Sequence, residues 1–244
     1  MFKFITDLAN PARFSALADR ILPWLAAATA AAFAYGLYQS LMVAPADYQQ
    51  GETVRIMFVH VPAAWLCMAC WSVMTVAALG TLVWRHPLAD VAQQAAAPIG
   101  AAFTAVCLIT GSLWGRPMWG AWWVWDARLT SVLVLFLMYL GVIALWRAID
   151  EPARAARAVA ILTLVGAINL PIVKFSVDWW NTLHQPASVF KMSGSAIDPS
   201  ILYPLLWMGL AYLLLFVTLL LVRMRTELMR RRLRRLALLS LSAA

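Results

Sequence analysis

Charged residues are scarce in this sequence. Asp, Glu, Lys and Arg make up 12% of its 244 residues, whereas a soluble domain carries about 25%. Hydrophobic residues reach 64%, and the stretches between the apolar runs are too short to bury a core of their own. This composition excludes a soluble enzyme or a soluble binding module. The formal net charge of +8 does not indicate a nucleic-acid partner, because the basic residues flank apolar runs.

Cysteine is also rare, and two cofactor motifs are missing. The three cysteines, Cys67, Cys70 and Cys107, all lie inside apolar runs. Cys67 and Cys70 form a CxxC motif, but a redox pair needs an accessible site that stabilises a thiolate, so we interpret both as small hydrophobic residues. The chain has no CxxCH motif for covalent attachment of c-type haem. It has no GxxxxGK(S/T) motif either, so any ATP hydrolysis would belong to a partner.

Long apolar runs dominate what is present. They predict an all-α integral membrane protein, a bundle of six transmembrane helices in a single polytopic domain over residues 1–244. Each run is close to or above the ~20 residues that a bilayer core needs. The first is longer than the core of a signal peptide, about 7–15 residues, so we expect it to be retained. The predicted spans are 21–43, 56–84, 91–113, 127–146, 158–174 and 200–222, preceded by a short surface helix within residues 1–20.

The distribution of Lys and Arg predicts the orientation of these spans. Fourteen of the 19 basic residues fall in one set of segments between the spans, and five fall in the other. Because cytoplasmic segments carry the excess of Lys and Arg, both termini are predicted to be cytoplasmic, including a basic tail over residues 223–244. The tail can contact membrane lipids. Residues 114–130 and 175–199 then form loops that face outward, and the second span starts at the same face.

The first of these loops, WGRPMWGAWWVWDARLT, holds five of the 13 tryptophans. Indole suits the boundary between membrane and water, so the rings could serve only as interfacial anchors. They could equally form a platform for a flat, aromatic, half-apolar ligand. We expect Gly115, Pro117 and Gly120 to shape the backbone here, and Asp126 to cap the fourth span. The five tryptophans are Trp114, Trp119, Trp122, Trp123 and Trp125.

The predicted topology brings two of the three histidines to this face. His60 lies at the outer end of the second span and His184 in the second outer loop, whereas His86 is cytoplasmic. Taken separately, His60 could bond a neighbouring carbonyl, and His184 could be a loop residue without a role. Haem is the ligand that would use the whole set: two imidazoles for its iron, indoles for its macrocycle, and Arg128 or Arg116 for its propionates.

Three motifs carry a resemblance to a known family. WGRPMWGAWWVWDARLT resembles the WWD signature of haem-handling membrane proteins. VHVPAAW at residues 59–65 and DWWNTLHQ at residues 178–185 resemble, within that group, the CcmC family of cytochrome c maturation. The resemblance extends over nearly the whole chain.

The resemblance implies a multi-pass protein of the bacterial inner membrane that binds haem b transiently at the periplasmic face. His60 and His184 are the implied axial ligands of the iron. The implied binding loop holds Trp114, Trp119, Trp122, Trp123, Trp125, Asp126 and Arg128. The resemblance further implies transfer of haem to the chaperone CcmE, assembly with CcmD and the ABC-type subunits CcmA and CcmB, and no enzymatic activity.

Two other functions fit the composition. A membrane b-type cytochrome would carry electrons, but it would typically use a second histidine pair across the bilayer, and only His86 is available there. Alternatively, the chain could be a structural or permease subunit of an ABC transporter, with tryptophans that only anchor it in the membrane.

Overall fold

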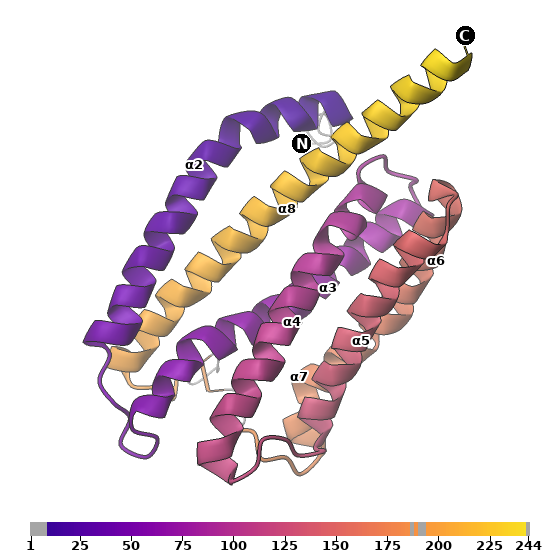
Figure 1. Ribbon diagram of the computed structural model, residues 1–244. Helices are drawn as coiled ribbons and strands as arrows, with labels where there is room; N and C mark the ends of the chain where they lie inside the picture. The colour runs from indigo at the N-terminus through magenta and orange to yellow at the C-terminus, as the bar shows by residue number, and fades with distance from the viewer. Residues whose placement is uncertain (1–8, 186–187, 190–193, 243–244) are drawn as a thin grey trace.

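The computed structural model describes residues 9–185, 188–189 and 194–242, and within these the chain is helical (Figure 1). Six helical segments are long and apolar enough to cross a membrane, which confirms the predicted number of spans for the described residues. The helices are α2 (Pro11–Tyr38), extended by a π-helical turn (Gln39–Val43), a 3-10 turn (Glu52–Ile56), α3 (Met57–Leu82), α4 (Ala89–Trp119), α5 (Ala127–Ala148), α6 (Pro152–Ala167), α7 (Asn169–Trp179) and α8 (Pro199–Ser242).

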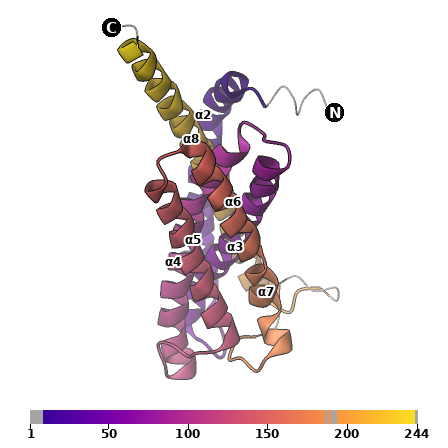
Figure 2. The same ribbon diagram turned by 90° about the vertical axis from the view of Figure 1, so that its right-hand side faces the viewer.

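The helices form two groups that lie side by side (Figures 1 and 2). The helix α2 packs chiefly on α8, while α3 lies at the centre of the second group and contacts α4, α6 and α8. The start of α2 and the end of α8 lie at one end of the bundle, and the α2–α3, α4–α5 and α7–α8 connections lie at the other (Figure 1). This arrangement agrees with an even number of spans. Which end faces the cytoplasm stays a prediction.

Two span boundaries differ from the prediction. The fifth span consists of two helices, α6 and α7, separated at Ile168. Pro171 explains the break, because it has no N–H to donate to the carbonyl of Ala167 one turn earlier. The helix α7 continues to Trp179, into the predicted loop 175–199. At the N-terminus, α2 joins part of the expected surface helix to the first span; residues 1–8 of that prediction lie outside the described residues.

A tight contact between four helices fixes the second group. Trp71 of α3 is fully buried and donates its indole N–H to the carbonyl of Thr163 in α6 (3.0 Å). Its ring meets Tyr139 of α5 edge to face, with centroids 4.7 Å apart. The Tyr139 hydroxyl in turn donates to the carbonyl of Cys67 (2.7 Å). The ring of Tyr139 lies over Gly100 of α4, where any Cβ would overlap it. These contacts hold α3, α4, α5 and α6 in one register.

The cysteines lie within this core. Cys67 and Cys70 are both buried and carry free thiols, as does Cys107. Their positions agree with the interpretation as small hydrophobic residues rather than a redox pair.

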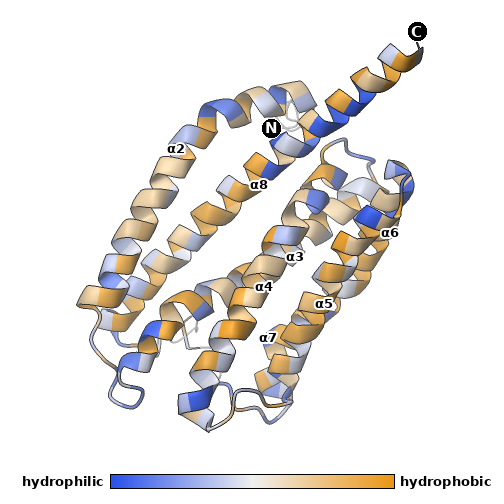
Figure 3. Ribbon diagram, viewed as in Figure 1, coloured by the Kyte–Doolittle hydropathy of each residue, from blue (hydrophilic) through white to orange (hydrophobic). Residues whose placement is uncertain are grey.

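Apolar residues cover the middle of the helices, and polar ones gather at the two ends and along the last turns of α8 (Figure 3).

Candidate functional site

The tryptophan-rich stretch is largely helical, which differs from the predicted loop over residues 114–130. The helix α4 continues to Trp119, and the connection to α5 covers only residues 120–126. The helix ends at Gly120, which has φ +75° and donates its N–H to the carbonyl of Arg116 (3.1 Å). Only glycine reaches this conformation without strain. Gly115 and Pro117 lie inside the last turns of α4, where a proline costs a single hydrogen bond.

His60 is held by α4. It is the fourth residue of α3, which follows a 3-10 turn and stays helical through Pro62, although a proline disfavours helical geometry at the residue before it. The Nδ1 atom of His60 lies 3.1 Å from the carbonyl oxygen of Cys107 and 3.1 Å from the hydroxyl of Thr110. A carbonyl can only accept a hydrogen bond, so the bond to Cys107 requires the proton on Nδ1. The lone pair of Nε2 is then available to a ligand.

The imidazole of His60 is also confined by its neighbours. A Cβ added at Gly111 would lie 3.0 Å from Cε1 of the ring, so glycine is what allows the ring to approach α4. Trp114 meets the imidazole edge to face, with centroids 5.7 Å apart. The indole N–H of Trp114 donates to the side chain of Gln50 (3.0 Å), which ties the α2–α3 connection to the same place.

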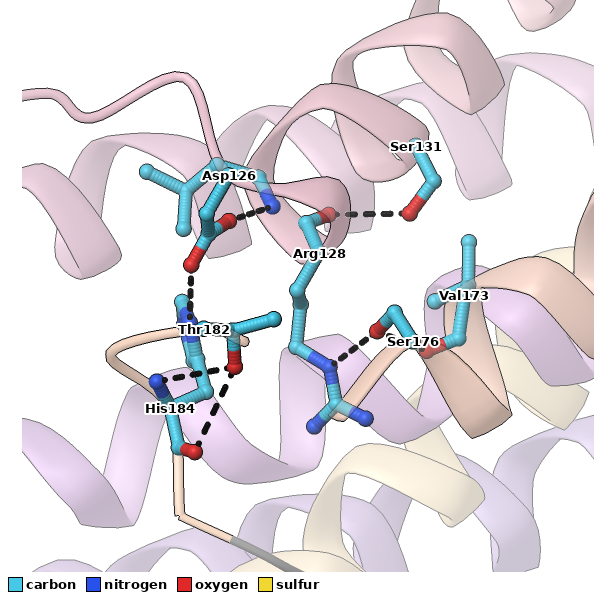
Figure 4. A network of polar contacts seen from close by, with 8 residues as sticks. Asp126, Arg128, Ser131, Val173, Ser176, Thr182 and His184 are labelled. Atoms are coloured by element: carbon cyan, nitrogen blue, oxygen red, sulfur yellow. Dashed lines mark hydrogen bonds and ion pairs between the residues drawn. The ribbon is translucent and has the colours of Figure 1, made fainter. Parts of the chain in front are cut away.

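His184 reaches α4 from the other connection. Its ring lies 5.0 Å from the ring of Trp119, and its Nδ1 lies 3.3 Å from Oδ2 of Asp126 (Figure 4). The backbone N–H of His184 donates to the Thr182 hydroxyl (3.2 Å), which fixes the turn that carries it. Trp119 itself folds back over Gly115, where a Cβ would lie 3.0 Å from the indole.

Asp126 has two separate functions in this structure. Its Oδ1 accepts from the backbone N–H of Leu129 (2.7 Å) and caps α5, as the sequence predicts. Its Oδ2 faces Nδ1 of His184. The carboxylate is buried, so both bonds form away from water (Figure 4). An ionised carboxylate accepts only, which puts the proton of His184 on Nδ1 as well.

The charge state of His184 follows from this environment. Burial lowers the pKa of His184 below its ordinary value of 6.5, and the positive charge of Arg128 acts in the same direction. The charge of Asp126 and its hydrogen bond oppose this effect without overcoming it. The imidazole is therefore neutral at pH 7. A neutral imidazole is the form that ligates a metal.

Both predicted histidines thus lie against the same end of α4, here called the histidine end, His60 beside Cys107 and Thr110 and His184 beside Trp119. Each has Nδ1 tied to an acceptor of the protein and Nε2 left for a ligand. Histidines that bind metals in proteins show this arrangement, in which a carbonyl or carboxylate fixes the ring and the tautomer. Each imidazole is therefore suited to ligate a metal ion through Nε2.

The two predicted arginine partners are partly occupied. Arg128 donates from Nε to the Ser176 hydroxyl and from one terminal nitrogen to the carbonyl of Lys174, both at 3.0 Å, which ties α5 to α7. Its remaining N–H groups can still meet an anion. Arg116 bonds the carbonyl of Gly120 and is otherwise exposed.

The five tryptophans divide between two sides of α4. Trp114 and Trp119 contact the histidines, whereas Trp123 and Trp125 contact each other and line an apolar groove of about 540 Å³. At 100° per residue, the groove residues of α4 lie opposite the side that holds His60. The indole N–H of Trp123 is buried and has no acceptor among the described residues. Trp122 is exposed. The groove is further lined by Leu108, Ile109, Ser112, Leu113 and Leu133.

Sequence reasoning missed the residues that support the histidines. Gln50, Thr110, Gly111, Ser176 and Thr182 bond or pack against predicted site residues. Single polar residues in or beside an apolar run give little signal on their own. Only Thr110 and Gly111 could have been found from the sequence. If the third predicted span packs beside His60, one of its turns brings a polar group to the ring.

Comparison with known proteins identifies the family of this chain. The profile of the family described as heme exporter protein C, CcmC, matches residues 4–239. The chain is 70% identical over 238 residues to heme exporter protein C of Bradyrhizobium diazoefficiens, covering 98% of this chain and 90% of the relative. It is 50% identical over 225 residues to the Escherichia coli K12 protein of that name, covering 92% and 91%. For Rhodobacter capsulatus the identity is 43% over 233 residues, covering 95% and 96%. The chain therefore belongs to the CcmC family.

Proposed function

We propose that this protein binds haem b at the periplasmic face of the bacterial inner membrane and hands it to the haem chaperone CcmE during cytochrome c maturation. The iron takes its two axial ligands from Nε2 of His60 and Nε2 of His184. The protein turns over no substrate of its own, and haem is its cargo. The names of its relatives, heme exporter protein C, support a role in haem export.

One observation carries the proposal: two histidines from distant segments share one tautomer at one end of α4. Both rings are oriented through Nδ1 by protein acceptors, which leaves two Nε2 lone pairs without a protein partner among the described residues. A porphyrin iron needs two such nitrogens. An interfacial anchor or a structural subunit has no use for them.

The surroundings of the histidines supply the rest of a haem site. Trp114 and Trp119 give apolar ring surface beside the ligands, whereas the groove at Trp123 and Trp125 lies on the far side of α4. Arg128 keeps N–H groups for a propionate. A carboxylate of the ligand could also accept from the buried N–H of Trp123.

The attachment of His184 suits release of the cargo. This histidine sits on a connection between α7 and α8 rather than on a helix, and one hydrogen bond to Asp126 orients its ring. Movement of this connection would remove one axial ligand while His60 stays on α3. The acceptor in our proposal is CcmE, and CcmA, CcmB and CcmD complete the complex.

The test is a titration of the purified protein with ferric haem b, followed by optical and electron paramagnetic resonance spectra. The wild type should show six-coordinate, low-spin iron with two imidazole ligands. His60→Ala and His184→Ala should each lose this signature. His86→Ala is the matched control, because His86 lies at the far end of the bundle and its ring accepts a hydrogen bond from the backbone N–H of Leu88.

Two outcomes would count against the proposal. Unchanged spectra in both the His60→Ala and His184→Ala variants would exclude these residues as ligands. Intact ligation, but no haem passed to purified apo-CcmE, would refute the transfer step while leaving the binding site in place.

A further inference from the structure

A second site lies at the opposite end of the bundle. A cavity of about 420 Å³ opens between α4, α5 and α8, at the end of α5 farthest from Asp126. One carboxylate, that of Asp150, is part of its lining. The cavity is lined on its basic side by Arg147, Arg223, Arg230 and Arg234.

These four arginines carry more positive charge than the nearby carboxylates, Asp150 in the lining and Glu227 beside Arg223, can balance. None of them forms a salt bridge within residues 9–185, 188–189 and 194–242. Their neighbours on α8 differ: Arg225 bonds Asp19 at 2.7 Å, and Arg231 bonds Asp90 at 2.6 Å. Arg223 and Arg230 are close enough for their charges to repel. The positive charge gathered at the cavity therefore calls for an anion from outside the chain.

The spacing on α8 concentrates this charge on one side of the helix. At 100° per residue, Arg230 and Arg234 each fall within about 20° of Arg223 around the axis, on either side of it. Arg147 faces the same cavity from the end of α5. Arg232 and Arg235 lie at least about 100° away around α8 and do not line the cavity.

Trp146 gives an independent sign of a missing acceptor. It lines the cavity, and its indole Nε1 is buried without a hydrogen-bond partner among the described residues. Buried indole N–H groups usually have an acceptor. The cavity thus combines four guanidinium groups with a tryptophan whose N–H lacks an acceptor, and guanidinium groups are the chemistry that binds a phosphate group.

We propose that this cavity binds the phosphate headgroup of an anionic phospholipid. The other part of its wall is apolar, with Ala97 and Pro98 of α4 and Ile143 of α5, and it adjoins the membrane-spanning faces of both helices. A free phosphate ion would use the arginines alone, whereas a lipid uses the arginines and the apolar wall together. Arginine clusters beside membrane spans bind anionic lipids in this way, and guanidinium groups bond phosphate oxygens in pairs.

The experiment measures binding of dioctanoyl phosphatidylglycerol to the full-length protein in delipidated detergent micelles. The variant Arg230→Gln/Arg234→Gln should bind about 30-fold more weakly, because each arginine near a lipid headgroup contributes about 1 kcal/mol. The matched control Arg232→Gln/Arg235→Gln removes the same charge from the other side of α8 and should bind as the wild type does. Trp146→Phe keeps the ring, removes the donor, and should weaken binding about fivefold.

Three results would overturn the assignment. An equal loss of lipid affinity in both double variants would show that the lipid is attracted to basic charge in general and not to this cavity. Equal binding of dioctanoyl phosphatidylcholine would show that the anionic headgroup is not selected. Inorganic phosphate that displaces the lipid and binds as tightly as it does would assign the site to a free anion. The haem spectrum of Arg230→Gln/Arg234→Gln should be that of the wild type, so this proposal and the haem proposal fail separately.

Discussion

At the scale of single residues, Asp126 connects the start of α5 to His184, a proposed ligand of the iron. Its Oδ1 caps α5 and its Oδ2 orients His184, so the start of a membrane span and an imidazole depend on the same carboxylate. Substitution by asparagine separates the two functions. The amide oxygen can remain the cap, because asparagine is a good N-cap. The amide nitrogen must then face His184, and it donates rather than accepts.

We therefore predict that Asp126→Asn blocks His184 as a ligand without unfolding the bundle. The amide N–H requires a lone pair on Nδ1, so the proton moves to Nε2, the atom proposed to bind iron. Haem affinity should fall about 10- to 100-fold, as for other residues that orient metal-binding histidines. The measurement is a haem titration with detection of low-spin iron.

The control for this variant is Asp198→Asn. Asp198 accepts from the N–H of Ser200 (2.9 Å) at the start of α8 and does not contact either histidine. It should change neither the haem affinity nor the spectrum. A low-spin spectrum with two imidazoles in Asp126→Asn would contradict the assigned tautomer.

The lowered pKa of His184 predicts that its connection loosens in acid. The pKa of His184 in the folded protein is below the 6.5 of a free imidazole. The displaced, solvated histidine therefore binds protons more readily than the docked one, and docking is strongest above pH 6.5. Hydrogen exchange of residues 180–185 in the haem-free protein should become faster as the pH falls below that value. In His184→Gln, the exchange rate of these residues, corrected for its intrinsic pH dependence, should not increase as the pH falls.

At the scale of secondary structure, α4 organises the histidine end. Its carbonyl at Cys107 and its hydroxyl at Thr110 hold His60, and its last turn brings Trp119 to His184. At Gly111 the imidazole of His60 lies so close to α4 that an added Cβ would come within 3.0 Å of its Cε1. Small residues at such crossings let membrane helices approach each other.

Gly111→Ala should displace the imidazole of His60. The new Cβ would lie 3.0 Å from Cε1, so the ring must shift and its bond to Cys107 must weaken. We expect weaker haem binding and a broadened low-spin signal, measured by haem titration. Gly141→Ala is the control, because its Cβ would meet Leu162 at an ordinary 3.6 Å. That variant should be neutral, or more stable by up to about 1 kcal/mol through helix propensity. Unaltered haem binding in Gly111→Ala would show that the ring has room.

Much of this architecture could be predicted from the hydrophobic runs and from the residues that cap or end helices. Six spans, the cap at Asp126 and the start of α8 after Asp198 follow from local chemistry. The break at Ile168 and the helical end of α4 were not predicted, because Pro171 and Pro117 have opposite outcomes in similar apolar settings. Packing decides such cases. The hydrogen bonds that orient the two imidazoles through Nδ1 also depend on packing. No residue near His60 in the sequence indicates Cys107 as its acceptor.

At the scale of the whole molecule, α8 joins the two groups of helices. It packs on α2, α3 and α4, and its basic last turns continue as helix past the bundle (Figure 1). Arg231 joins these turns to α4 through Asp90 (2.6 Å) and Gln94 (3.1 Å). Beneath these bonds, Met224 and Leu228 pack on Leu88 and Val91.

Arg231→Gln should loosen α8 from α4 and leave haem binding intact. The pair is partly exposed, so the loss of stability should be about 1 kcal/mol, measured as a shift in the midpoint of unfolding by dodecyl sulfate. The haem spectrum should be unchanged, because this network lies at the opposite end from His60. Arg232→Gln is the control and should unfold like the wild type. Loss of the low-spin signal in Arg231→Gln would show that the two ends are coupled.

The pairing of α2 with α8 has a consequence for biosynthesis. Thr29 bonds Thr218 and Asp19 bonds Arg225, so the first span of the chain finds its main neighbour in the last. Roughly 160 residues separate Tyr38 from Pro199, which takes on the order of 10–30 s at about 5–20 residues per second. Throughout that time, α2 of each nascent chain lies in the membrane without α8, its main neighbour.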